Sequence, residues 1–215
     1  MSPKIAVVIG AARGIGRELV RQLSADSSMQ IIATVRQPID FGAPNVSSII
    51  LDQAIPSSIT QAASQIPEID TLIINGAFGD KDKMLGCPDE RFDKYLDINV
   101  KGPLRIIKAF LPAILVRETR QIVLTSSLCG SLQKQSEFDH GSLGPYSLTK
   151  AAGNMMMIQL HHELLDKQAG SQLIWGGPGG MPVETSVAGY VKVIKELKLA
   201  EHPQFIAWDG SIVPW

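Results

Sequence analysis

Residues 4–16 read Lys-Ile-Ala-Val-Val-Ile-Gly-Ala-Ala-Arg-Gly-Ile-Gly. The run that ends at Ile9 is rich in β-branched residues and has no polar alternation, which is typical of a strand buried on both faces. Glycine follows at once, and beyond Gly14 the apolar residues Ile15, Leu19 and Leu23 recur at helical spacing. This part of the chain therefore predicts a buried strand Lys4–Ile9, a glycine-rich turn and a helix.

The same alternation continues along the chain. Further strands are predicted at Gln30–Val35, Ser48–Leu51, Thr71–Ile74, Gln121–Thr125, Gln172–Trp175 and Phe205–Ala207. Longer helical patterns occupy Ser57–Gln65, Asp89–Arg117 and Pro145–Lys167. Strands that alternate with helices form a parallel sheet with helices on both faces, so we expect a doubly wound α/β fold. No repeat or linker divides residues 1–215, and we expect a single domain.

The composition excludes several classes of protein. The 215 residues carry 20 Lys and Arg against 21 Asp and Glu, so no global field draws the chain to nucleic acid or an anionic membrane. The apolar run Ala109–Val116, which includes Pro112, is far shorter than a membrane span, and no secretory leader is evident. Two cysteines suit a reducing compartment. We therefore expect a cytoplasmic protein with a small-molecule substrate.

The glycine turn predicts a phosphate site. Gly10, Gly14 and Gly16 would let a pyrophosphate approach the free N–H groups and the positive dipole end of the first helix. An ordinary tight turn would explain the glycines alone. The end of the second strand, Ala33-Thr34-Val35-Arg36, favours the phosphate, because a 2′-phosphate needs Arg where an NAD site has Asp or Glu. Arg13, in the glycine turn, could reach the same phosphate. Together, Arg13 and Arg36 predict NADP(H) as the cofactor.

A second motif carries acid–base chemistry. Tyr146 and Lys150 stand four residues apart, on one face of a helix that Pro145 is suited to start. A free tyrosine titrates near ~10, so proton exchange near neutrality needs a stabilised phenolate. The ammonium of Lys150 has the charge to lower the pKa of Tyr146.

Taken in order, these motifs resemble the classical short-chain dehydrogenases/reductases, most closely their compact C-factor-like branch. The matching segments are Gly10–Gly16, Ala33–Arg36, Leu51-Asp52, Asn75-Gly76-Ala77, Asn99-Val100 with Gly102, Thr125-Ser126-Ser127, Tyr146–Lys150, Pro178-Gly179, Thr185 and Trp208–Trp215. The resemblance implies a single-domain Rossmann fold and hydride transfer between NADPH and a small organic carbonyl or alcohol.

The resemblance also implies a catalytic tetrad. Tyr146 would be the general acid or base, and Ser127, rather than Ser126, would bind the substrate oxygen. Lys150 would bind the nicotinamide ribose, and Asn99 would hold a water that links Lys150 to solvent. The residues implied to bind the cofactor are Gly10, Arg13, Gly14, Ile15, Gly16, Arg36, Asp52, Asn75, Gly76, Ala77, Tyr146, Lys150, Pro178, Gly179 and Thr185.

Some positions depart from the family pattern. Ile9 stands where the family usually has Thr, which removes a hydroxyl that braces the turn. Phe78 replaces a glycine next to the expected adenosine. The segments at about 128–144, which include Phe138-Asp139-His140, and at about 176–190 are extended, and we expect them to shape the substrate pocket.

Two functions remain open at this point. The first is an NADPH-dependent carbonyl reductase or alcohol dehydrogenase. The second is a non-redox cyclase, isomerase or cofactor-sensing protein on the same scaffold. The resemblance implies a homodimer or homotetramer formed through helices Asp89–Arg117 and Pro145–Lys167. No metal is expected, because the adjacent His161 and His162 point in different directions on a helix.

Overall fold

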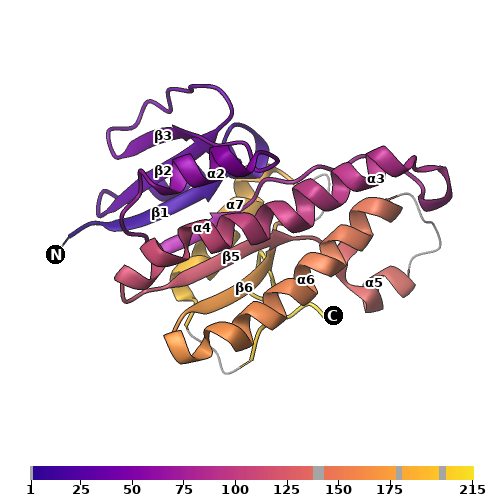
Figure 1. Cartoon of the computed structure of the whole chain (residues 1–215). Coiled ribbons are helices and arrows are strands. Elements are labelled where there is room, and N and C mark those ends of the chain that lie inside the picture. Colours follow the sequence, from indigo (N-terminus) through magenta and orange to yellow (C-terminus); the bar gives the residue numbers. More distant parts are fainter. Residues whose placement is uncertain (1, 138–142, 178–180, 199–201) are drawn as a thin grey trace.

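A parallel sheet organises the chain, and its elements follow one another as Figure 1 shows. The computed structural model describes residues 2–137, 143–177, 181–198 and 202–215. In these residues the strands are β1 (Lys4–Ile9), β2 (Met29–Val35), β3 (Val46–Ile50), β4 (Thr71–Ile74), β5 (Gln121–Ser126), β6 (Gly170–Trp175) and β7 (Phe205–Ala207). The α-helices are α1 (Gly14–Ser24), α2 (Pro56–Ala63), α3 (Asp89–Leu96), α4 (Gly102–Val116), α5 (Leu132–Ser136), α6 (Gly144–Leu164) and α7 (Val183–Glu196).

The strand order places a crevice in the middle of the sheet. The order is β3-β2-β1-β4-β5-β6-β7, and all the ladders between these strands are parallel. From β1 the chain adds β2 and β3 on one side and β4 to β7 on the other, so the strand order switches direction between β1 and β4. In open α/β sheets, ligands bind outside the carboxyl ends of the strands at such a switch point. The glycine turn follows β1, and Asn75 follows β4, so both lie at this crevice.

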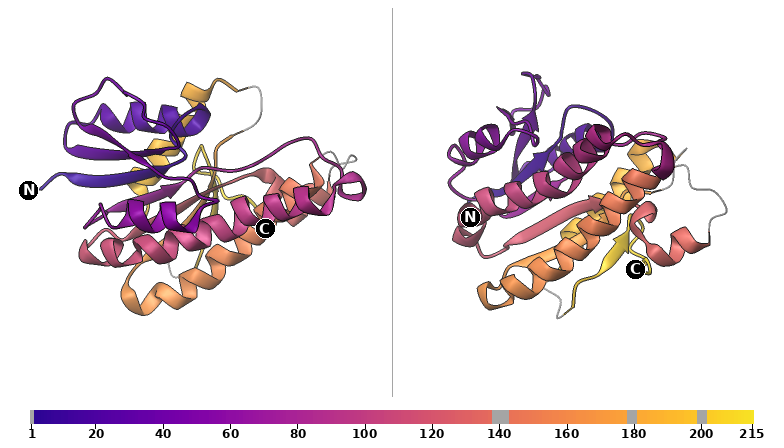
Figure 2. Two further views of the ribbon diagram at one scale, coloured as in Figure 1. Left: turned by 45° about the horizontal axis from the view of Figure 1, so that its top comes forward. Right: turned by 45° about the vertical axis from the view of Figure 1, so that its right-hand side comes forward.

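Two apolar layers sandwich the sheet. Leu19 of α1 and Tyr190 of α7 pack with Val8 against one face. Ile59 of α2, Phe110 of α4 and Met157 of α6 pack on the other face. Figure 2 shows the α3–α4 segment and α6 running side by side over that second face. None of the described helices is long and apolar enough to cross a membrane.

The predicted fold class and the predicted strands are confirmed, with shifted ends at β2, β3, β5 and β6. The single helix predicted at Asp89–Arg117 is wrong, because a π-helical turn, Asp97–Lys101, separates α3 from α4. Pro103 has no N–H to donate to the carbonyl of Asn99, so the regular helical bond cannot form and the chain takes a wider turn.

The predicted loops are also shorter than expected. The segment 128–144 contains the 3₁₀ turn η3 (Leu128–Gly130) and helix α5. The segment 176–190 runs into α7, a helix of 14 residues where the sequence pattern indicated only a short one. The second predicted substrate loop therefore ends at Pro182, the residue before α7. Phe138-Asp139-His140, in the first predicted loop, lie outside the described residues.

Two glycines of the turn are required by close backbone approach. Gly10 has φ +80°, and a Cβ there would lie 2.6 Å from the Cα of Gly76. A Cβ at Gly16 would overlap the carbonyl oxygen of Gly10. Side chains at these positions would push β1, α1 and the turn after β4 apart.

We expect Gly16→Ala to lower the free energy of unfolding by about 2–3 kcal/mol, because the added methyl meets backbone that cannot move freely. Gly86→Ala is the matched control, since a Cβ at Gly86 would have no neighbouring atom within 4 Å. Urea unfolding of both variants checks this. Equal stabilities of the two variants would contradict the packing argument.

Candidate active site

The glycine turn opens into a pocket of about 490 Å³ at the carboxyl ends of β1, β2 and β4. Its wall contains most of the residues predicted to bind the cofactor: Gly10, Arg13, Gly14, Ile15, Arg36, Asp52, Asn75, Gly76 and Ala77. A Cβ at Gly14 would meet no atom within 4 Å, so the turn there faces open space. Gly16 is buried beneath the turn and does not line the pocket.

The charges of this pocket fit a phosphorylated dinucleotide. Arg13 and Arg36 come from different strand ends and line the same cavity. The first turn of α1 carries no acidic residue that would oppose an anion at its N-terminus. Asp52 faces the same pocket, and its Oδ1 accepts a hydrogen bond from the backbone N–H of Ala54 at 2.9 Å.

The brace that Ile9 was expected to remove is present. The hydroxyl Oγ1 of Thr34, on β2, accepts a hydrogen bond from the N–H of Gly10 at 3.2 Å. Ile9 itself carries no hydroxyl, and a neighbouring strand supplies an oxygen to the turn instead. Gln53 braces the other side, where its Nε2 donates to the carbonyls of Gly76 and Ile98, each at 3.1 Å. No sequence motif predicts Thr34 or Gln53 as part of the site.

A further residue predicted to bind the cofactor lies away from this pocket. Thr185 lies in the first turn of α7, where its N–H donates to the carbonyl of Pro182 at 3.1 Å, and it does not line the pocket. Its buried neighbour Ser186 donates instead to the carbonyl of Gly176, at the end of β6. Pro178 and Gly179 lie outside the described residues.

The predicted catalytic side chains gather at the carboxyl end of β5. The Ser127 side chain lies close enough to the Tyr146 hydroxyl to lower the pKa of the phenol. Ser126 turns away, and its Oγ donates to Oδ1 of the buried Asn154 at 2.6 Å. Ser126 is therefore engaged by Asn154, whereas Ser127 is the serine near the phenol, and its role toward the substrate oxygen stays a prediction.

The acidity of Tyr146 differs from the prediction. Burial raises its pKa to about 12, the thiol of Cys129 adds to this rise, and the hydrogen bond from Ser127 opposes it. The Lys150 Nζ lies 5.5 Å from the centre of the Tyr146 ring and donates to the carbonyl oxygen of Thr125 at 2.7 Å. Lys150 does not lower the pKa of Tyr146 here, because its own pKa of about 8 leaves the amine neutral at the pH at which Tyr146 ionises.

Lys150 itself is a buried cation. Only 7% of the residue is exposed, and burial lowers its pKa to about 8. The carbonyl that holds it belongs to Thr125, whose Oγ1 is hydrogen-bonded to the buried Tyr190 hydroxyl at 2.8 Å. The ammonium is therefore fixed by β5, which α7 braces from the opposite face of the sheet.

Asn99 joins the pocket to the catalytic helix. Its Oδ1 accepts from the N–H of Phe78, and its Nδ2 donates to the carbonyl of the same residue, both at 2.7 Å. Nδ2 also donates to Oγ1 of Thr149 on α6 at 2.9 Å. The side chain of Asn99 therefore holds the turn after β4 against the helix that carries Tyr146 and Lys150.

A segment that the sequence analysis missed borders the phenol. A Cβ at Gly79 would lie 3.1 Å from the Tyr146 ring. Asp82, three residues further on, accepts at Oδ2 from Tyr95 at 2.7 Å and from Arg91 at 2.6 Å, and its carbonyl accepts from Gly144 at 3.1 Å. Cys129, in the turn after β5, is half-buried. No sequence motif marks this segment, because its bonds join residues distant in the chain.

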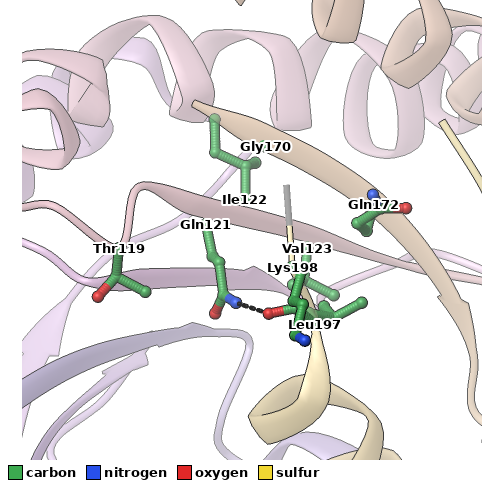
Figure 3. Close-up of a pocket in the computed structure, with 8 residues that line it drawn as sticks. All are labelled: Thr119, Gln121, Ile122, Val123, Gly170, Gln172, Leu197 and Lys198. Carbon is green, nitrogen blue, oxygen red and sulfur yellow. Dashed lines mark hydrogen bonds between the residues drawn. The ribbon is translucent and has the colours of Figure 1, made fainter. Parts of the chain in front are cut away.

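A second cavity lies at the opposite edge of the sheet. Figure 3 shows it at the amino ends of β5 and β6, where Gln121 Nε2 donates to the carbonyl of Leu197 at 3.1 Å. Parallel strands put Tyr146 and the glycine turn at the other edge. This cavity therefore takes no part in the site described above.

Comparison with known families agrees with this geometry. The model of the short chain dehydrogenase family matches residues 4–179, which is most of the chain. The chain belongs to this family of oxidoreductases, and the resemblance predicted from its motifs is confirmed.

Individual relatives cover the chain more fully. It is 28% identical to the uncharacterized oxidoreductase C663.09c of Schizosaccharomyces pombe, over 99% of this chain and 98% of that protein. It is 30% identical to the short-chain dehydrogenase/reductase atnB of Arthrinium sp, over 73% of this chain and 67% of that protein. Among solved structures, the NADPH-bound carbonyl reductase from chicken fatty liver superposes with a TM-score of 0.90 at 24% identity, covering 100% of both chains. This likeness shows a shared fold.

The buried ammonium predicts a pH-dependent stability. Because the folded pKa of Lys150 is about 8 and its ordinary value is 10.5, the charged form costs stability below pH 8, and deprotonation relieves that cost as the pH rises toward 10.5. We expect the free energy of unfolding of the wild type, minus that of Lys150→Met, to rise by about 2–3 kcal/mol between about pH 8 and about pH 10.

Urea unfolding at both pH values measures this difference. The variant removes the charge and keeps an apolar stem, so other titrating groups cancel in the subtraction. Tyr146, whose pKa is raised to about 12, opposes the trend only above pH 10, where free tyrosines begin to ionise. A difference that does not change with pH would contradict the burial of a charged Lys150.

Proposed function

We propose that this chain is an NADPH-dependent carbonyl reductase or alcohol dehydrogenase that acts on a small organic substrate. The observation that carries the proposal is the pairing of Tyr146 with Ser127 beside the buried Lys150, at the same sheet edge as the pocket of Arg13 and Arg36. Phe78 lines that pocket, and its neighbour Gly79 borders the Tyr146 ring, so the two sites are continuous.

NADPH is supported by the two guanidinium groups. A 2′-phosphate at the end of β2 would be within the cavity that Arg13 and Arg36 line, and no carboxylate occupies the strand end that would bind a free ribose. A carbonyl reductase from Pseudomonas aeruginosa PAO1 that superposes on this chain was crystallised with NADP, with a TM-score of 0.84 at 22% identity. Its fold, like that of the chicken enzyme, fits the predicted C-factor-like branch.

The raised pKa of Tyr146 suits the reductive direction. At neutral pH the phenol keeps its proton and can donate it to a carbonyl oxygen held by the Ser127 hydroxyl. When bound, the reduced nicotinamide supplies the hydride. Lys150, with a pKa of about 8, can return a proton to the phenolate near neutrality. The Asn99 carbonyl, which has no helical N–H four residues on because Pro103 stands there, is suited to hold a water beside this path.

Assembly and location remain predictions. Leu148 and Met155 are exposed on α6, where an apolar surface is consistent with the predicted homodimer or homotetramer. A cytoplasmic location rests on the cysteine content alone.

Tyr146→Phe tests the proposed acid. We expect NADPH consumption across a panel of small carbonyls to fall about 100-fold or more, because a general acid contributes about that factor or more. NADPH binding should survive, since the ring keeps its position, and calorimetry on the same variant is the control. Full turnover by the variant would refute the assignment. Product formation by the wild type without net NADPH consumption would favour the cyclase or isomerase alternative.

Arg36→Ala tests the cofactor. We expect NADPH to bind about 10- to 100-fold more weakly while NADH binding is unchanged, because only NADPH carries the 2′-phosphate that a charged hydrogen bond would hold. Arg17→Ala removes the same charge from α1 outside the pocket wall and serves as the control. Equal affinities of the wild type for NADPH and NADH would overturn the cofactor assignment.

A further inference from the structure

Phe78, the residue that departs from the family glycine, is packed beneath positive charge. Its ring centre lies 4.6 Å from that of Tyr95 and 4.5 Å from the Lys94 Nζ. The Arg91 guanidinium lies further away, at 5.4 Å. Both distances to the cations fall within the range of cation–π attraction. Phe78 therefore does not fill the pocket as a free ring but supports a cation at its edge.

Of these two cations, only Lys94 is available to an anion. Arg91 is paired with Asp82 at 2.6 Å and with Asp80 at 2.8 Å. In the described part of the chain, no carboxylate forms an ion pair with Lys94. Lys94 and Phe78 also line the same pocket as the glycine turn. An uncompensated ammonium on that wall is a binding group for a phosphate oxygen.

The strand order indicates which phosphate Lys94 can reach. Phe78 belongs to the turn after β4, and β4 is the direct neighbour of β1, which carries the glycine turn. Arg36 follows β2, on the other side of β1. The wall of Phe78 and Lys94 therefore faces the glycine turn, where a diphosphate would lie, rather than the end of β2, where a 2′-phosphate would lie.

We propose that Lys94, seated on the ring of Phe78, binds the diphosphate of the coenzyme and is an additional coenzyme-binding residue of this chain. The inference rests on the proposed function. The glycine turn after β1 offers backbone N–H groups to the diphosphate. Lys94, on α3, adds a side-chain charge from the β4 side of the pocket. Lys94 does not discriminate between coenzymes, because NADPH and NADH share the diphosphate.

The test compares dissociation constants of the purified full-length chain for NADPH and for NADH by calorimetry. We expect Lys94→Gln to weaken both coenzymes by about tenfold, the size of one charged hydrogen bond at a partly exposed site. Lys108→Gln, an exposed lysine on α4 outside the pocket, is the charge-matched control and should change neither. Phe78→Leu keeps an apolar side chain but removes the π face, and should weaken both coenzymes about two- to fivefold.

The outcomes separate the inference from the proposed function. If the wild type binds neither coenzyme, the proposed function fails. If the wild type binds NADPH and Lys94→Gln binds both coenzymes as tightly as Lys108→Gln does, the role of Lys94 is refuted. A loss confined to NADPH would place Lys94 on the 2′-phosphate and overturn the diphosphate assignment. Thermal unfolding of each variant shows whether a lost affinity reflects a lost fold.

Discussion

The contact between the turns after β1 and β4 is the constraint on which the site depends. Gly10 and Gly76 approach so closely that a Cβ at Gly10 would lie 2.6 Å from the Cα of Gly76. This approach is possible because both strand ends carry glycine, and the N–H groups of Asn75 and Gly76 both donate to the carbonyl of Ile9. Residues of both turns line the pocket, so fixed backbone forms part of its wall.

The same turn couples the pocket to the catalytic residues. Asn99 bonds the backbone of Phe78 at both its N–H and its carbonyl, and it reaches Thr149 on α6. A displacement of the turn after β4 would therefore be transmitted to the helix of Tyr146. The π-helical turn that places Asn99 arises where Pro103 interrupts regular helix geometry. The local distortion is thus part of how the two halves of the site are aligned.

Burial of Lys150 has a cost that the surroundings must offset. An ammonium in the protein interior is stable only with hydrogen-bond partners, and here the Thr125 carbonyl accepts from it at 2.7 Å. Thr125 is in turn bonded to Tyr190, so both faces of the sheet contribute to the position of one charge. The raised pKa of Tyr146 and the lowered pKa of Lys150 share burial as their main cause. At neutral pH Tyr146 keeps its phenol proton, and Lys150 keeps most of its charge.

The sequence by itself determined the fold class, the strand positions, the family, and the convergence of Arg13 with Arg36, because strand and helix periodicity, glycine spacing and motif order are local properties. The assignment of the substrate oxygen to Ser127 rather than Ser126 is a prediction from the sequence. Only the tertiary structure decided that Thr34 braces Gly10, that Lys150 bonds a strand carbonyl, and that Lys94 rests on Phe78. The first two of these contacts join residues more than 20 positions apart, and the third joins the turn after β4 to α3. Their energies depend on burial and on packing across the sheet, which no local pattern encodes.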